Sequence, residues 1–280
     1  MPLFVVLAVL GSAVLHASWN ALAKAIPDRR VASTLLGATF TVAGGVGVLM
    51  VAAPDRASWG YLAISSVLQT AYMLLLMGAY RVGSFGRVYP VARGTSPVLI
   101  TILAAVLLGD RLGVGQLAGV LVVSAGLVWL VFAHGRPPSG SGRSLGLAMG
   151  AGATIAAYSI VDGLGVRASG NPLSYGLWLF LLQGPLIVVA CAVTAGPGFG
   201  AGLVRWWRHG VVGGLLTVAA YAIVLWAQAR SPLALVSALR ETSVLFALFL
   251  GGLLFAEKVT VRALAATALA VVGIAMIKIA

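Results

Sequence analysis

The feature that most constrains this chain is a succession of apolar stretches of about 20 residues, each long enough to cross the roughly 30 Å hydrocarbon core of a bilayer as an α-helix. The sequence predicts ten such helices, at about 3–23, 32–53, 58–80, 84–109, 113–133, 145–166, 173–195, 209–229, 232–255 and 260–279. They use most of the 280 residues, so no room is left for a soluble domain. The sequence therefore predicts an all-α polytopic membrane protein with ten transmembrane helices, which excludes a water-soluble enzyme.

Composition and charge agree with this class. The chain is 61% hydrophobic and only 9% charged, whereas a soluble domain is usually about 25% charged. The 18 Lys and Arg outnumber the six acids, but they are spread over the loops without a basic cluster, so nucleic acid is not an expected partner. Eleven of them follow odd-numbered predicted helices and five follow even-numbered ones or lie at the C-terminus. The positive-inside rule then predicts cytoplasmic odd loops and outward-facing termini.

The chain also contains an internal repeat. The stretch Arg93 to Ser96 (RGTS) aligns with Arg240 to Ser243 (RETS), and an acid–base pair follows each at the same offset, Asp110-Arg111 and Glu257-Lys258. Each half then holds five helices. Because five is odd, the second half must enter the membrane in the opposite sense, which predicts two inverted five-helix repeats.

The polar segment between the halves divides the chain into a first repeat at 1–134, a linker at 135–144 and a second repeat at 145–280. Inverted repeats are a transporter architecture, because two similar halves can open a site at the membrane midplane to one side and then to the other. Gene duplication can also give a purely structural repeat, so the charges within the membrane carry the rest of the functional argument.

Two arginines lie within predicted helices. Arg93 and Arg240 are each about 12 Å along their helix, measured from opposite faces of the membrane. An arginine at the centre of a transmembrane helix costs at least about 2.5 kcal/mol to insert, so it usually faces a polar cavity on a substrate pathway. The alternatives are that each arginine pairs with an acid, caps helix carbonyls or extends to an interface. We expect both to line a substrate cavity.

Only two of the six acids, Asp162 and Glu241, are predicted at membrane depth. Two buried cations and two buried anions suit a zwitterionic substrate, or an anionic one if the acids are protonated. Asp162 or Glu241 would hold an amine or carry a coupling proton. Asp162 is also near the end of its helix, where it could instead be an interfacial charge facing Arg167, and Glu241 could instead be a counter-ion of Arg240.

Polar and aromatic side chains on other helices are candidates for the cavity wall. His16, Trp19 and Asn20 share one helix face, either as a cavity lining or as an interhelical hydrogen-bond cluster. Tyr158 lies one turn before Asp162. The further candidates are Tyr72, Tyr89 and Tyr221. Singly, each aromatic is most simply packing or an interfacial anchor, but together they suggest an aromatic-walled site.

The sequence offers no sign of catalytic or cofactor chemistry. The three histidines, His16, His134 and His209, are far apart in sequence, so they form no metal motif. The chain contains neither a GxSxG nucleophile motif nor a phosphate-binding loop for ATP. We therefore expect no cofactor, no metal and no enzymatic activity, and an ion or substrate gradient as the driving force.

The ten helices in two halves, with Gly109 to Leu112 (GDRL) and Ala256 to Val259 (AEKV) following the fourth and ninth, resemble the EamA-type transporters of the drug/metabolite transporter superfamily. The stretches Tyr89 to Pro97 and Leu239 to Ser243 are similar to one branch of that family. The resemblance covers nearly the whole chain. It implies a cavity lined by predicted helices 1, 3, 4, 6, 8 and 9, with 5 and 10 packed behind, and a multi-pass protein of a bacterial inner membrane. It also implies cytoplasmic termini, against the charge count.

The hypothesis from the sequence is a secondary transporter, an exporter, of small zwitterionic or anionic metabolites such as amino acids. It would work by alternating access, with Arg93 and Arg240 binding a carboxylate or phosphate group. Transport of lipophilic cations, drugs or lipid head groups is the alternative, and an intramembrane enzyme is a remote one. The expected partners are the substrate, the bilayer and a coupling proton or other ion, and the chain is a monomer or a homodimer.

Overall fold

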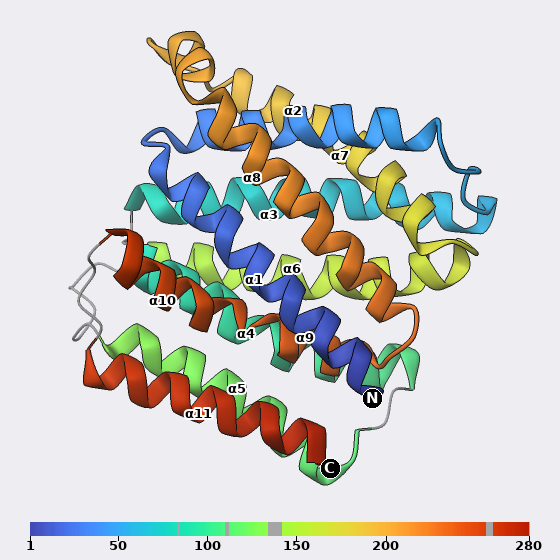
Figure 1. Cartoon of the computed structure of the whole chain (residues 1–280), viewed down its shortest axis with the longest axis vertical. Helices are drawn as coiled ribbons and strands as arrows, with labels where there is room; N and C mark the ends of the chain where they lie inside the picture. The colour runs from blue at the N-terminus through green and yellow to red at the C-terminus, as the bar shows by residue number, and fades with distance from the viewer. Residues whose placement is uncertain (83–84, 110–111, 134–141, 256–259, 280) are drawn as a thin grey trace.

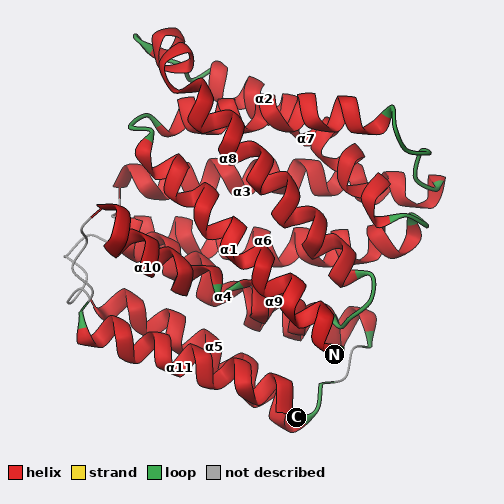
Figure 2. Cartoon of the chain, viewed as in Figure 1, coloured by secondary structure: helices red, strands yellow, loops and turns green. Residues whose placement is uncertain are grey.

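The computed structural model describes residues 1–82, 85–109, 112–133, 142–255 and 260–279, and in these ranges every regular element is a helix (Figure 2). The predicted acid–base pairs at 110–111 and 257–258 lie outside the described residues. The helices are α1 (Leu3–Ala25), α2 (Arg29–Val48), a short 3-10 helix (Arg56–Ser58), α3 (Trp59–Val82), α4 (Phe85–Leu108), α5 (Val114–Ala133), α6 (Gly142–Ala168), α7 (Pro172–Ala192), α8 (Phe199–Gln228), α9 (Leu233–Arg240), α10 (Ser243–Phe255) and α11 (Val261–Ile279).

Length and composition make these helices membrane spans. Among the described residues, α1, α2, α3 with its preceding 3-10 turn, α6, α7 and α8 are each long and apolar enough to cross a bilayer. Shorter apolar stretches lie within α4, α5 and α11. The chain is therefore a polytopic α-helical membrane protein, as its apolar stretches predict.

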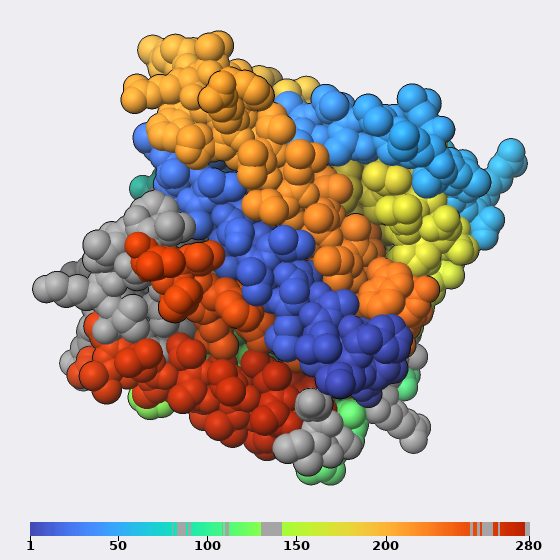
Figure 3. All heavy atoms as spheres, in the orientation of Figure 1, coloured from blue at the N-terminus to red at the C-terminus, as the bar shows by residue number. Residues whose placement is uncertain are grey.

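The helix packing repeats itself between the two halves. Helices α2 and α7 pack together at one end of the molecule and α5 and α11 at the other, with the remaining helices between them (Figure 1). In the repeat, α6 of the second half corresponds to α1 of the first, and α8 corresponds to α3. Accordingly, α1 packs on α8, and α6 packs on α3. On the face in Figure 3, α1 lies between α8 and α10, and it contacts both. Corresponding helices of the two halves thus make equivalent contacts.

Contacts between loops show which chain segments share a face. On one face, Arg30 in the first turn of α2 donates a hydrogen bond to the carbonyl of Thr194, joining the start of α2 to the loop at 193–198. On the other, the N–H of Asp55 donates to the carbonyl of Ser169 (3.2 Å), joining the loops at 49–58 and 169–171. We call the first the basic face, because the loops after odd-numbered predicted helices carry most of the cations, and the second the opposite face.

Glycines set how closely the outer helix pairs approach. At the crossing of α2 and α7, a Cβ added at Gly184 would lie 2.6 Å from the carbonyl oxygen of Gly37. At the crossing of α5 and α11, one added at Gly119 would lie 2.7 Å from the carbonyl oxygen of Gly273. Real Cβ atoms do not approach this closely, so both crossings depend on small residues, as in other membrane bundles.

Several predicted helix bounds were wrong, among them the end of the second helix, which is Val48 rather than 53. Helix α8 begins at Phe199 rather than near 209, so Arg205 and Arg208 are helical, because Trp206 packs on the Ile26, Val31 and Ala32 cluster and holds the first turns in place. Helix α6 begins at Gly142, within the predicted linker. The predicted helix 232–255 is interrupted after Arg240, and its halves are α9 and α10.

Candidate functional site

A cavity of about 70 Å³ lies between the two halves, and we call it the central cavity. Seven helices contribute to its wall: α1, α2, α3, α4, α6, α7 and α8, joined by the last residue of α9. The resemblance implied no lining by α2 or α7, and the structure corrects this, whereas α5 and α11 do lie behind. The lining residues are His16, Trp19, Leu36, Phe40, Gln69, Tyr72, Met73, Arg93, Tyr158, Phe180, Gln183, Ile187, Thr217, Tyr221 and Arg240.

Arg93 is neutralised by an acid from the other half of the chain. Its Nη1 lies 3.2 Å from Oε1 of Glu241, with side-chain exposures of 2% and 1%. The Nη2 of Arg93 also contacts Nε2 of His16 on α1. Glu241 is therefore a counter-ion, as one alternative had it, but its direct ion pair is with Arg93 and not with Arg240. Adjacent helical residues point about 100° apart, and the crossing of α4 with α9 brings Arg93 to the carboxylate.

Arg240 is held by aromatic side chains. Its Nη2 donates to the hydroxyl of Tyr158 (3.4 Å), and its guanidinium carbon lies 5.4 Å from the ring centroid of Tyr221. The residue is only 5% exposed. Within the described parts of the chain, no carboxylate lies within 4 Å of Arg240. One of the two cavity arginines thus makes no direct ion pair with a described carboxylate.

The helix break lies directly beside this charge. Arg240 is the last residue of α9, and the residues Glu241 and Thr242 form a turn before α10 begins at Ser243. All of these residues are buried. Non-helical backbone at membrane depth is tolerated where protein or a cavity surrounds it, and interrupted helices commonly form the ion and substrate sites of transporters. The aligned stretch Arg93 to Ser96 is continuous helix in α4.

The α1 candidates serve both of the roles left open for them. His16 and Trp19 line the central cavity, and the indole N–H of Trp19 donates to Nδ1 of His16 (3.1 Å). The side-chain amide of Asn20 donates to the carbonyl of His16 (2.7 Å) and lies outside the central cavity. The three residues therefore form a hydrogen-bonded cluster within one helix that also contributes to the cavity wall.

Asp162 is enclosed by hydrogen-bond donors. Its Oδ1 accepts from the hydroxyl of Tyr175 (2.9 Å), and its Oδ2 accepts from the hydroxyl of Tyr221 (2.5 Å) and the amide of Gln69 (3.1 Å). Asp162 has no exposed surface. The alternative of an interfacial charge facing Arg167 is wrong, because Arg167 donates instead to backbone carbonyls of the α8–α9 connection. Two members of this cluster, Gln69 and Tyr221, also line the central cavity.

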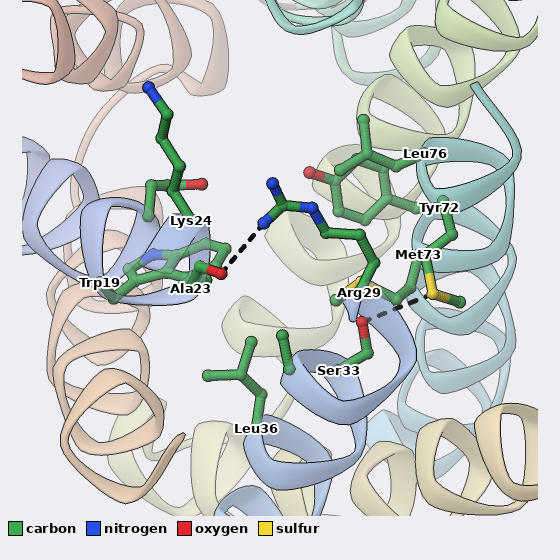
Figure 4. Close-up of a pocket in the computed structure, with 12 residues that line it drawn as sticks. Trp19, Ala23, Lys24, Arg29, Ser33, Leu36, Tyr72, Met73 and Leu76 are labelled. Atoms are coloured by element: carbon green, nitrogen blue, oxygen red, sulfur yellow. Dashed lines mark hydrogen bonds between the residues drawn. The ribbon is translucent and has the colours of Figure 1, made fainter. Parts of the chain in front are cut away.

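A second cavity of about 60 Å³ leads from the central cavity toward the basic face, and we call it the basic-face cavity. The two cavities share Trp19, Leu36, Tyr72 and Met73. The remaining wall comes from the end of α1, the start of α2 and the second half of α3 (Figure 4). It includes the predicted residue Asn20 and two cations, Lys24 and Arg29. This second cavity therefore extends from the central cavity toward the side of the molecule that carries the basic loops.

The structure brings most predicted site residues to these cavities. Seven of them line the central cavity, and two of these seven, Trp19 and Tyr72, also line the basic-face cavity. Asn20 lines the basic-face cavity, Glu241 pairs with Arg93, and Asp162 lies behind Tyr221. The side chain of Tyr89 lies outside the described residues. That these residues bind a substrate stays a prediction.

Sequence reasoning missed two glutamines. Gln69 and Gln183 line the central cavity from α3 and α7, and Gln183 is only 2% exposed. The Oε1 of Gln183 makes no hydrogen bond with any described residue. The rule that polar groups at membrane depth are functional candidates would have found both. Among the described residues, no group of three His, Cys, Asp or Glu side chains could hold a metal ion.

Comparison with known proteins gives one family. The profile of the EamA-like transporter family matches residues 3–132 and again residues 143–279. A comparison with curated proteins finds no match. A solved crystal structure of a protein superposes with a TM-score of 0.77 at 20% sequence identity, covering 98% of each chain. At this identity, the likeness shows a shared fold.

Proposed function

This chain belongs to the EamA-like transporter family, and from that premise we propose that it is a secondary transporter of small zwitterionic metabolites, such as amino acids, or of small carboxylates. The substrate would bind in the central cavity and reach either side of a bacterial inner membrane by alternating access, with export as the working direction.

The observation that carries this proposal is that Arg240 lines the central cavity and makes no direct ion pair with a described carboxylate. A buried arginine without an acid partner is costly, and a substrate carboxylate that forms a bidentate contact with the guanidinium removes that cost. Arg93 has a different role here from the one its sequence suggested. Because Glu241 neutralises it, Arg93 would position His16 and the α9–α10 turn rather than bind the carboxylate.

A second polar group suits the amine of a zwitterion. Gln183 presents a buried acceptor oxygen that no described residue satisfies. A buried acceptor left without a donor costs about 1–3 kcal/mol, which an ammonium or amide N–H of the substrate would recover. Asp162, whose oxygens already accept three hydrogen bonds, would close the route to the opposite face. Asp162 and Glu241 remain the candidate carriers of a coupling proton.

Counterflow in proteoliposomes tests this proposal. Labelled neutral amino acids and small carboxylates would be exchanged by the wild-type protein, and Arg240→Ala would abolish exchange. Arg240→Lys would keep a small part of it, because lysine supplies a point charge without the bidentate fork. Gln183→Leu would weaken exchange of amino acids more than exchange of simple carboxylates. Arg262→Ala, at an exposed position on α11, is the matched control.

The aromatic wall favours a second candidate, the transport of lipophilic cations. Six aromatic residues line the central cavity (Trp19, Phe40, Tyr72, Tyr158, Phe180 and Tyr221), and aromatic faces attract organic cations. The two arginines of the same wall repel them. Cation exchange that survives Arg240→Ala would favour this candidate, and amino-acid exchange lost in Arg240→Ala would overturn it.

A further inference from the structure

Helix α8 is longer than a membrane span requires, and it begins at the basic face. Its 30 residues measure about 45 Å along the helix axis, whereas the hydrocarbon core is about 30 Å thick. The helix follows the loop at 193–198, which the contact of Arg30 with Thr194 joins to the start of α2. Figure 3 shows its first turns, in yellow-orange, projecting beyond α1 and α2. These turns, which we call the α8 start (residues 199–209), therefore reach the level of the lipid head groups.

One side of the α8 start is fixed to the protein. Phe199, Leu203 and Trp206 pack on a small buried cluster formed by the end of α1 and the start of α2. A Cβ added at Gly202 would lie 2.9 Å from a methyl carbon of Val31, so α2 approaches the helix closely here. These contacts hold the other side of the α8 start in a defined orientation.

The outward side carries two arginines next to an apolar stripe. Arg205 and Arg208 are exposed, and so are Val212 and Leu215 further along α8. At 100° per residue, these four side chains lie within an arc of about 80° around the helix. Val212 and Leu215 are about 6 and 11 Å from Arg208 along the axis, at 1.5 Å per residue. The outward side of α8 thus changes from arginine to apolar residues over the depth at which a phospholipid changes from head group to acyl chain.

Tryptophan rings orient both arginines. The guanidinium carbon of Arg205 lies 5.8 Å from the ring centroid of Trp206, and that of Arg208 lies 5.6 Å from the ring centroid of Trp207. A ring contacts one face of a guanidinium, whereas the N–H groups point outward in its plane. The rings therefore hold the two cations and leave N–H groups available to an anion.

No acid of α8 competes for these guanidiniums. The sequence contains no Asp or Glu between Asp162 and Glu241, a stretch that includes all of α8. Asp28, in the loop before α2, caps that helix and lies 3.5 Å from Nε of Arg30. No ion pair joins Arg205 or Arg208 to an acid of the described residues. An anion at the α8 start therefore meets two exposed arginines.

We propose that the α8 start binds the phosphate of an anionic phospholipid head group, with an acyl chain of the same lipid along Val212 and Leu215. Arginine forms strong, often bidentate hydrogen bonds with phosphate, and tryptophan is favoured at the membrane–water interface. A soluble phosphate would contact the arginines alone, whereas a lipid also covers the apolar stripe. The site goes beyond the proposed function and does not depend on the substrate. Because α8 also carries Thr217 and Tyr221 of the central cavity, the lipid would anchor a helix of the cavity wall.

Fluorescence quenching by brominated lipids tests the site without requiring transport. Val212→Cys, labelled with bimane, would be placed in mixed bilayers of phosphatidylglycerol and phosphatidylcholine in which one or the other lipid has brominated chains. Val189→Cys, at an exposed position near the basic-face end of α7, reports the ordinary lipid around the protein, and the wild type with its buried Cys191 gives the background. Both lipids carry a phosphate, but the arginines repel the ammonium of phosphatidylcholine. We expect phosphatidylglycerol to be preferred about five- to tenfold at Val212→Cys, and both lipids to quench about equally at Val189→Cys.

Substitution of the arginines shows which groups cause the preference. Arg205→Gln/Arg208→Gln should remove most of it, whereas Arg205→Lys/Arg208→Lys should keep part of it, because lysine also binds phosphate as a point charge. Arg230→Gln is the matched control, since Arg230 is also exposed and lies 4.8 Å from the ring centroid of Trp226 near the other end of α8. It should leave the preference unchanged.

Three results would overturn the proposal. The first is an equal preference at the two labelled positions, and the second is a preference that survives Arg205→Gln/Arg208→Gln. The third is loss of the preference when inorganic phosphate is added at constant ionic strength, which would identify a soluble anion as the occupant.

Thermal unfolding gives an independent measurement. A thiol-reactive dye reaches the buried Cys191 only as the protein unfolds. In detergent, added phosphatidylglycerol should raise the Tm of the wild type by about 2–4 °C more than added phosphatidylcholine does, because a ligand of the folded state stabilises it. Arg205→Gln/Arg208→Gln should abolish that difference and Arg230→Gln should keep it. A difference that persists in the double variant would contradict the site.

Discussion

Removing the acid of the buried ion pair should destabilise the protein strongly. The Nη1 of Arg93 and Oε1 of Glu241 lie 3.2 Å apart, and neither side chain exposes more than 2% of its surface. At an effective dielectric constant of about 20, unit charges at that distance attract each other by roughly 5 kcal/mol. In Glu241→Ala this attraction is lost, while the contact of the guanidinium with His16 stays. We expect the free energy of unfolding to fall by about 3–5 kcal/mol, as when one partner of a buried pair is deleted.

The single cysteine provides the assay. Cys191 on α7 has no exposed surface, so a thiol-reactive dye becomes fluorescent only as the protein unfolds. A loss of about 3 kcal/mol corresponds to a fall in Tm of roughly 6–12 °C for a chain of this size. Glu241→Gln keeps an acceptor oxygen for Arg93, so we expect about half of that fall.

The double variant Arg93→Met/Glu241→Met decides whether the loss comes from the unpaired charge. Replacing both partners of a buried pair by apolar residues is often neutral, so the double variant should melt above Glu241→Ala. A double variant that melts below both single variants would refute the reasoning. So would a Tm of Glu241→Ala within 1 °C of wild type.

Three further substitutions test the structure around the site with the same melting assay. Asp162→Asn replaces an acceptor oxygen by an amide NH₂, which faces hydroxyl donors such as that of Tyr221. We therefore expect the free energy of unfolding to fall by about 1–2 kcal/mol. Gly184→Ala places a Cβ 2.6 Å from a backbone oxygen of α2, and separating the two helices should cost about 1–3 kcal/mol. Asn171→Ala removes the side-chain oxygen that accepts from the N–H groups of Leu173 and Ser174, for a loss of about 1 kcal/mol.

Ala195→Ser, at an exposed position, is the control for all three substitutions, and it should change the free energy of unfolding by no more than about 0.5 kcal/mol. An Asp162→Asn protein as stable as wild type would mean that its three donors find other partners. An unchanged Tm for Gly184→Ala would mean that α2 and α7 are farther apart than the structure has them. A loss in Asn171→Ala larger than that in Gly184→Ala would mean that the cap has tertiary contacts beyond its helix.

Hydrophobic patterning sufficed to predict the membrane spans, because the requirement for about 20 apolar residues acts on each helix separately. The buried arginines were predictable for a similar reason. A charge at membrane depth needs a polar environment wherever the helix packs. The aligned stretches at Arg93 and Arg240 also indicated that the two halves place corresponding residues at one site.

Pairing between helices was not predictable in the same way. Glu241 is next to Arg240 in sequence, yet its partner is Arg93, because the crossing of α4 with α9 decides which groups meet. The break after Arg240 has no glycine or proline at Glu241 and Thr242 to announce it. The turn is buried, and the N–H groups of Glu241 and Thr242 still donate to the nearby carbonyls of Ser237 and Leu239.

The two repeats thus place their equivalent arginines, Arg93 and Arg240, in different surroundings. In α4, Arg93 lies in continuous helix and makes an ion pair with an acid of the other half of the chain, whereas Arg240 lies at the end of a broken helix and makes no direct ion pair with a described carboxylate. Closing the empty cavity on both sides would leave the Arg240 guanidinium buried without a carboxylate contact, which raises the energy of the occluded state. A substrate carboxylate would neutralise it and so favour occlusion, because a ligand shifts a conformational equilibrium by its differential affinity for the two states. The loaded protein should therefore change its accessible side faster than the empty one, and exchange of substrate for substrate should be faster than net flux.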